Sequence, residues 1–115
     1  MADSIAGDLV IQPEVVADIA GHVALESYGV VGMAAPTLTD GIAKLLPARA
    51  LRRGIKVVTT DDGVHIDLFV IVEHGTNIAE VSRMLSENVA YQLRDSTGID
   101  VAGVDVHVQG VKVRS

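Results

Sequence analysis

Two histidines and two acidic residues interrupt an otherwise apolar segment, HIDLFVIVEHG, at residues 65–75. Side chains alternate along a β-strand, so His65 and Asp67 are expected to lie together on one face. The opposite face would be apolar and would belong to the core; it carries Ile66, Leu68, Val70 and Val72. An imidazole and a carboxylate two residues apart are compatible with a metal site, although two ligands do not complete one.

A second pair with the same spacing, Asp105 and His107, lies in the last apolar segment, VAGVDVHVQGVKV. If the two strands are neighbours, all four groups could converge as metal ligands or catalytic groups. The alternative is a solvent-exposed face on which polar pairs between strands stabilise the sheet. We favour this alternative, and therefore predict no catalytic, cofactor-binding or metal-binding residue.

Other candidate sites are weaker. Acidic residues and a histidine recur every four positions in the first predicted helix, at Glu14, Asp18, His22 and Glu26. This row resembles a set of ligands, but it is also typical of a water-facing stripe with i,i+4 pairing, which we favour. The chain has no cysteine, which excludes thiol nucleophiles and thiolate metal sites, and no serine lies in a nucleophile-elbow motif.

The charge distribution indicates a different kind of site. The net charge is −6, yet no acidic residue lies between Asp40 and Asp61, where five of the nine basic residues occur. We predict a surface excursion at residues 37–54 and name four candidate partner-binding residues: Lys44, Arg49, Arg52 and Arg53. These cations could meet an acidic partner or an anionic surface, and a simple solvated loop is the alternative. Nucleic acid is not an expected partner, given the acidic chain and its three aromatic residues.

The periodicity of the chain predicts an α+β fold in the order β-α-β-β-β-α-β, with two helices packed on one mainly antiparallel sheet in two layers. The predicted strands are residues 7–11, 30–35, 55–60, 64–73 and 101–113, with a β-bulge at Gly110. Helices are predicted at 13–27 and 77–97, the second starting with a capping box at Asn77 and Glu80 and closed by Gly98. A short helix is expected at residues 40–46, before Pro47.

Length and hydropathy set the remaining expectations. The 115 residues suit one domain, residues 1–115. No apolar run approaches the roughly 20 residues that a membrane-spanning helix needs, so direct membrane insertion is not expected. The first residues lack the pattern of a secretory signal, which favours a cytoplasmic location.

Four segments in order carry a family resemblance: GDLVIQPEVVADIAGHVALESYGVVGMA, RRGIKV, VHIDLFVIVEHGTNIAEVS and VDVHVQGVKV. Residues 7–113 resemble the alkaline-shock-protein or envelope-stress-response family of Gram-positive bacteria, most closely its YloU-like branch. The resemblance implies a small intracellular protein without enzymatic activity or cofactors, linked to cell-envelope homeostasis. It also implies self-association, a separate membrane-anchor protein as partner, or a dihydroxyacetone-kinase-like partner.

These observations lead to one main hypothesis and two alternatives. The main hypothesis is a non-enzymatic interaction or scaffold module that forms homo-oligomers or docks to an envelope-associated partner, with the last strand as an edge for strand addition. The alternative for this edge is that Lys112 and the bulge at Gly110 protect it against unspecific pairing. One alternative is a metal-binding or enzymatic domain that uses the histidine–aspartate pairs. The other is binding of an anion, lipid or RNA, by the basic residues of segment 44–56.

Overall fold

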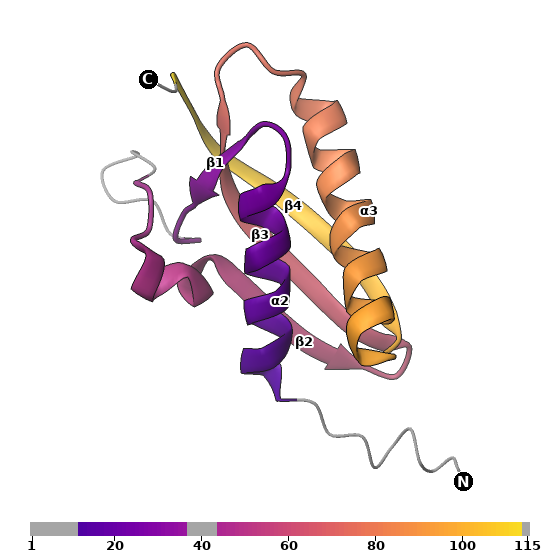
Figure 1. The fold of residues 1–115 in the computed structure, drawn as a ribbon. Helices are drawn as coiled ribbons and strands as arrows, with labels where there is room; N and C mark the ends of the chain where they lie inside the picture. The colour runs from indigo at the N-terminus through magenta and orange to yellow at the C-terminus, as the bar shows by residue number, and fades with distance from the viewer. Residues whose placement is uncertain (1–11, 37–43, 114–115) are drawn as a thin grey trace, which may run out of the picture.

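The structure, a computed structural model, describes residues 12–36 and 44–113. Its elements are α2 (Pro13–Glu26), β1 (Val30–Met33), the 3-10 helix η1 (Ala48–Gly54), β2 (Ile55–Thr60), β3 (Gly63–Glu73), α3 (Ile78–Thr97) and β4 (Val101–Lys112) (Figure 1). The predicted α+β class is confirmed, and the order of elements follows the prediction from α2 onward. The strand predicted at residues 7–11 lies outside the described residues.

The long strand β3 is the centre of the sheet. Strand β2 pairs antiparallel with the first half of β3, and β1 pairs antiparallel with its second half. Strand β4 runs parallel to β3 from Val64 to Glu73 and so occupies the other edge along its whole length. Two of the three pairings are therefore antiparallel, as predicted, but the longest is parallel. A parallel neighbour needs a crossover, which α3 provides.

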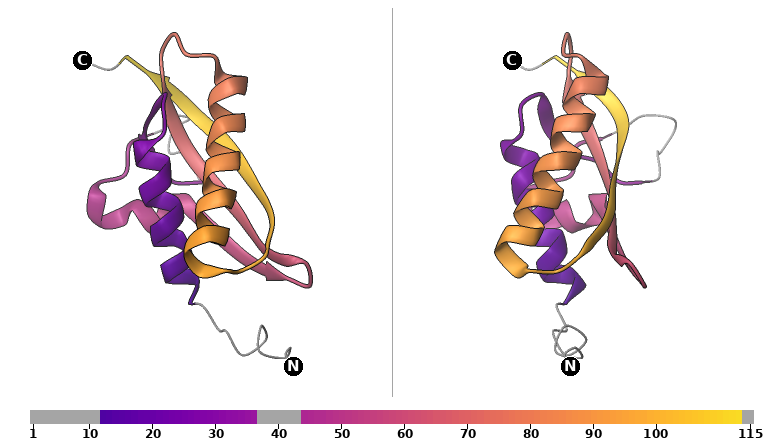
Figure 2. Two further views of the ribbon diagram at one scale, coloured as in Figure 1. Left: turned by 45° about the vertical axis from the view of Figure 1, so that its right-hand side comes forward. Right: turned by 90° about the vertical axis from the view of Figure 1, so that its right-hand side faces the viewer.

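Both helices cover the same face of the sheet, which gives the predicted two layers (Figure 2). Helix α3 presents Val81, Leu85, Val89 and Leu93 to the sheet, all fully or almost fully buried. Helix α2 presents small residues, and a Cβ atom at Gly21 would lie only 3.0 Å from Cδ1 of Ile55. Small side chains thus let α2 lie close to β2.

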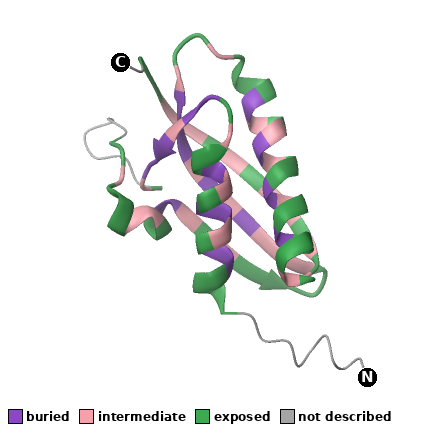
Figure 3. Ribbon diagram, in the orientation of Figure 1, coloured by how far each residue is buried: buried purple, intermediate pink, exposed green. Residues whose placement is uncertain are grey.

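The core lies between these helices and β3 (Figure 3). The four apolar residues predicted on the inner face of β3 are fully buried: Ile66, Leu68, Val70 and Val72. The opposite face, which we call the outer face, was predicted to be solvated, and this is wrong at Ile71, which is 1% exposed. Gln109 of β4 donates to the carbonyl oxygens of Ala35 and Pro36. These two residues follow β1, and β3 separates β1 from β4 in the sheet. Ala35 and Pro36 must therefore reach β4 by crossing the outer face near Ile71.

Local signals correctly marked the ends of α3 and the bulge of β4. The Asn77 side chain accepts a hydrogen bond from the Glu80 N–H at 3.0 Å, and Gly98 adopts a left-handed conformation after the helix. Only this half of the capping box is seen, because the Glu80 carboxylate bonds to Arg83. The register of β4 shifts between Val108 and Gly110, where the bulge was predicted.

The segment between β1 and β2 differs from its prediction. Lys44 to Leu46, the described part of the helix predicted at 40–46, is not helical, and Leu45 forms a β-bridge with Ala34. The Leu45 side chain occupies the space that a Cβ atom at Gly32 would need, at 2.7 Å, and this packing favours the extended conformation. Helical structure starts instead after Pro47, in η1.

Candidate functional site

The four polar residues singled out on β3 and β4 lie together on the outer face. Parallel pairing places Asp67 beside Asp105 and Phe69 beside His107, while His65 lies beside Gly103. Paired residues of neighbouring strands share a face, so both sequence pairs point away from the helices. We call His65, Asp67, Asp105 and His107 the His–Asp ladder.

Contacts within the His–Asp ladder run across the two strands. Nε2 of His65 lies 3.0 Å from Oδ2 of Asp105, and Nε2 of His107 lies 2.8 Å from Oδ1 of Asp67. Nε2 of His65 also lies 3.7 Å from Oδ1 of Asp67, which links the two pairs. The structure therefore brings together all four groups that the spacing suggested.

Two neighbours position the imidazole rings. A Cβ atom at residue 103 would lie 3.1 Å from Nδ1 of His65, so Gly103 leaves the space in which this ring lies across β4. The ring of His107 stacks on Phe69, with centroids 4.6 Å apart and planes inclined by 12°. Asp67 is the most sheltered member of the ladder, with a side chain 20% exposed, whereas that of Asp105 is 64% exposed. The ladder is thus sheltered at Asp67 and open to water at Asp105.

The second candidate site is the basic segment, which we define as Lys44, Arg49, Arg52, Arg53 and Lys56. All five are exposed. Arg49, Arg52 and Arg53 belong to η1, which packs beside α2, whereas Lys44 precedes it and Lys56 lies on β2.

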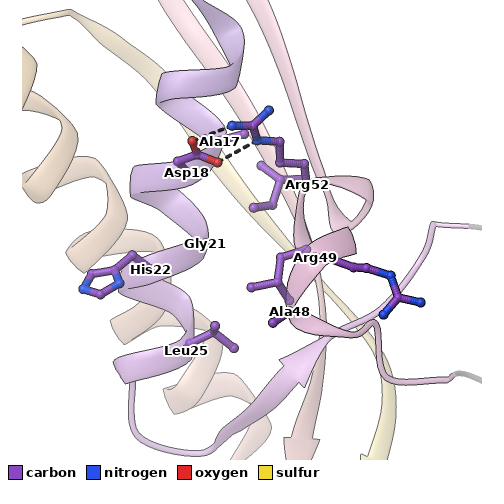
Figure 4. A pocket seen from close by; sticks show the side chains of 10 residues that line it. Ala17, Asp18, Gly21, His22, Leu25, Ala48, Arg49 and Arg52 are labelled. Atoms are coloured by element: carbon purple, nitrogen blue, oxygen red, sulfur yellow. Dashed lines mark hydrogen bonds and ion pairs between the residues drawn. The ribbon is translucent and has the colours of Figure 1, made fainter.

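Arg52, one of the four candidate partner-binding residues, already forms an ion pair within the chain. Its Nε and Nη2 donate to the two carboxylate oxygens of Asp18 on α2, both at 2.7 Å (Figure 4). The hydrogen bonds and positive charge of Arg52 lower the pKa of Asp18, and Asp18 raises the pKa of Arg52. Arg52 therefore fastens η1 to α2, and the predicted water-facing stripe of α2 is engaged at this position.

A cavity of about 400 Å³ lies between α2 and η1 beside this ion pair. Its lining includes the small or apolar residues Ala17, Gly21, Leu25, Leu51 and Ile55. The Asp18–Arg52 pair lies at its edge, and the Arg49 side chain points away from α2 (Figure 4). Arg49 and Arg53 have no ion-pair partner within the described parts of the chain, so they are the cations of η1 that remain free.

Within the described residues, no helix is both long and apolar enough to cross a membrane.

Comparison with known proteins gives a consistent result. The model of the alkaline shock protein 23 family, described as having a cell envelope-related function, matches residues 1–113. The chain is 37% identical over 108 residues to the uncharacterized protein YloU of Bacillus subtilis (strain 168), covering 93% of this chain and 90% of YloU. It is 33% identical over 108 residues to the uncharacterized protein Spy1614 of Streptococcus pyogenes serotype M6, covering 93% and 89%.

Among solved structures, the chain is similar to MamM-CTD 215-293, with a TM-score of 0.50 over 90% of this chain and all of that chain. The sequence identity is 12%, so this likeness shows the fold alone.

Proposed function

Because the chain belongs to the alkaline shock protein 23 family, whose function is related to the cell envelope, we propose that it is a non-enzymatic interaction module that associates with itself. The proposal includes a cytoplasmic location, close to the membrane through an anchor protein. One observation carries it: β4 has a single neighbouring strand, β3, and over its 12 residues no other strand of residues 12–36 and 44–113 pairs with its second edge.

The open edge of β4 is suited to strand addition. An unpaired edge presents a row of backbone N–H and C=O groups that can pair with another strand. Every residue of β4 is at least partly exposed, whereas five residues of β3 are buried. The outer edge of β2, at six residues, is half as long. Of the two sheet edges in the described part of the chain, that of β4 therefore offers the longer backbone surface to a partner.

A second copy of the same chain is a suitable occupant of this edge. Two β4 strands related by a twofold axis pair antiparallel, which extends the sheet through the dimer with one self-complementary surface. Strand β4 carries one acidic residue, Asp105, and one basic residue, Lys112, with His107 between them. Its formal charge is balanced when His107 is neutral, so two copies of the strand carry no excess of like charge.

Cysteine scanning tests this arrangement cleanly, because the chain has no native cysteine. Single cysteines are introduced at four exposed positions of β4: Ala102, Asp105, His107 and Lys112. Opposed Cα atoms in an antiparallel pair lie about 4.5–5.5 Å apart, within the range of a disulfide. Only the position nearest the twofold axis meets its own counterpart, so we expect one variant to form a covalent dimer rapidly under mild oxidation.

Tyr91→Cys is the matched control, since Tyr91 is 65% exposed but lies on α3. Sedimentation of the wild-type chain over a wide concentration range gives an independent measure of the dimer. Monomer alone in sedimentation, together with equally slow cross-linking at every β4 position and at Tyr91, would overturn the proposal.

A second candidate function is docking of an acidic, envelope-associated protein by the basic segment. The supporting observation is that Arg49 and Arg53 are exposed on a helix that Arg52 fastens to α2, so they are presented on an anchored surface. Such a partner could be the membrane anchor or the dihydroxyacetone-kinase-like protein that the family resemblance implies. Lys44, which precedes η1 in the sequence, is the third residue that we propose to contact this partner.

Photo-crosslinking in cells tests this docking. A crosslinking residue at position 49 or 53 should capture an acidic protein, and the same residue at Glu87 of α3 should not. Because exposed charges are screened by salt, the purified complex should weaken as ionic strength rises, and the Arg49→Glu/Arg53→Glu variant should lose it. Capture that is identical at all three positions, or binding that is unchanged in the double variant, contradicts the role of these arginines.

A further inference from the structure

We infer that His65, Asp67 and Asp105 form a binding site for one divalent transition-metal ion of the Zn²⁺ type, and that His107 positions Asp67 in that site. Each of the first three residues offers one ligand atom, and the three atoms lie within 4.8 Å of one another. The inference does not depend on self-association, because it concerns side chains of one chain.

The separations of these atoms are close to those of a metal site. In tetrahedral zinc sites the metal–ligand bonds of about 2.0–2.2 Å place neighbouring ligand atoms roughly 3.3–3.6 Å apart. Nε2 of His65 lies 3.0 Å from Oδ2 of Asp105 and 3.7 Å from Oδ1 of Asp67, values on either side of that separation. Small side-chain rotations would suffice to bind an ion, and the exposed Asp105 is free to make them.

The charges of the site also favour a cation. Two carboxylates approach the same nitrogen of His65, but a ring N–H can donate fully to only one of them. Lys56, which is paired with Asp67 and shares its face, makes no ion pair with it within the described structure. A divalent ion would contact both carboxylates at once and balance their formal charge.

The chemistry of the donors indicates which ion. One imidazole nitrogen and two carboxylate oxygens are typical ligands of Zn²⁺ and its neighbours in the periodic table, whereas Mg²⁺ and Ca²⁺ prefer six or more oxygen ligands. Three protein ligands on an open surface leave a fourth position for water. The same ligand number is found in zinc sites that remain accessible.

His107 acts through Asp67 and does not contact the ion. Its Nε2 lies 2.8 Å from Oδ1 of Asp67, and its ring is held by stacking on Phe69. Partners of this kind orient metal-bound carboxylates, and their loss commonly weakens metal affinity by about 10–100-fold. His107 is therefore a positioning residue.

Titration of the full chain with Zn²⁺ tests the site, with calorimetry for affinity and histidine ring NMR signals for location. We expect one ion per chain, with ring signals that shift at His65 and not at His22 or His74. His65→Gln and Asp67→Asn should each weaken binding by at least about tenfold, since each removes one of three ligands. His22→Ala is the matched control, because His22 also lies 3.4 Å from a carboxylate, that of Glu26, but outside the ladder.

The role of His107 requires a separate pair of variants. His107→Phe keeps a ring to stack on Phe69 but loses the hydrogen bond, so Zn²⁺ affinity should fall. His107→Gln keeps a donor and should restore part of that affinity. Affinity for Zn²⁺ that is unchanged in both His65→Gln and Asp67→Asn, or shifts confined to His22 and His74, would overturn the site; equal affinities in the two His107 variants would overturn the positioning role.

Discussion

Gly63, at the start of β3, is the position at which one added methyl group should most disturb the pairing that builds the ladder. Its φ of 125° is one that side-chain-bearing residues rarely adopt. A Cβ atom at this position would lie 2.3 Å from the carbonyl oxygen of Asp100, which is backbone and cannot rotate away. That oxygen accepts the Val64 N–H at 2.9 Å, the first hydrogen bond between the segment before β4 and β3.

The expected loss of stability follows from these contacts. A residue held at such a φ costs about 1–3 kcal/mol, and the loss of one backbone hydrogen bond costs about 0.5–1.5 kcal/mol. Alanine also restricts the unfolded chain, which offsets about 0.4–1 kcal/mol. We therefore expect Gly63→Ala to lower the free energy of unfolding by about 0.5–4 kcal/mol, with the middle of the range near 2 kcal/mol.

Gly75→Ala separates the two causes. Gly75 also has a positive φ, 91°, but a Cβ atom there would meet nothing within 4 Å. Only the backbone strain remains, and the restriction of the unfolded chain offsets part of it, so the expected loss is about 0–2.5 kcal/mol, with the middle of the range near 1 kcal/mol. Urea denaturation at a fixed protein concentration measures both variants, and Gly63→Ala should lower the midpoint by roughly 1–3 M. Equal losses in the two variants would show that the contact with Asp100 does not matter.

Three further predictions concern stability. Leu85→Ala should lower the free energy of unfolding, measured by urea denaturation, by about 3–5 kcal/mol. Ile78→Ala on the same helical stripe should lower it clearly less, because Leu85 is 0% and Ile78 43% exposed. Similar losses in the two variants would contradict the observed burial. Asn77→Ala should lower the free energy of unfolding by about 1 kcal/mol, because α3 loses its cap. Asn77→Ser should retain most of that stability, because serine is also a good cap. Arg52 lowers the pKa of Asp18, so the stability that the charged carboxylate adds is present above its unfolded pKa of about 3.9 and is lost as the pH falls through the folded value. The difference in free energy of unfolding between the wild type and Asp18→Asn should therefore be seen at pH 7 and disappear in acid. It should be small, because Asp18 and Arg52 are both exposed. A difference that persists in acid would contradict this linkage.

The sequence predicted best the features that depend on neighbouring residues along the chain. The buried stripe of α3, its cap at Asn77 and its end at Gly98 all follow from patterns within one or two helical turns. The bulge of β4 was visible because the valines change phase around Gly110. Ile78 has the same helical spacing as Val81 and Leu85 yet is 43% exposed, because periodicity does not reveal how far the first turn of α3 extends over the sheet.

Features that depend on distant residues were not predictable in the same way. Asp18 and Arg52 are 34 residues apart, and no periodic pattern connects them. The spacing on each strand predicted the two pairs of the His–Asp ladder, but not the parallel register that places Asp67 beside Asp105. The described end of the helix predicted at 40–46, residues 44–46, is not helical because Leu45 fills the space above Gly32, a contact between segments that local propensity does not describe.

The two proposals for β4 use different atoms and can be separated by experiment. Self-association uses the backbone groups of its open edge, whereas metal binding uses side chains on the outer face. Asp67→Asn changes a ligand on β3 and leaves the edge of β4 intact, so dimerisation should persist while Zn²⁺ affinity falls. If Asp67→Asn instead abolishes both, and if the wild-type dimer forms only with Zn²⁺, the ion itself joins the two copies. The dimer would then depend on the outer face and not on the open edge of β4.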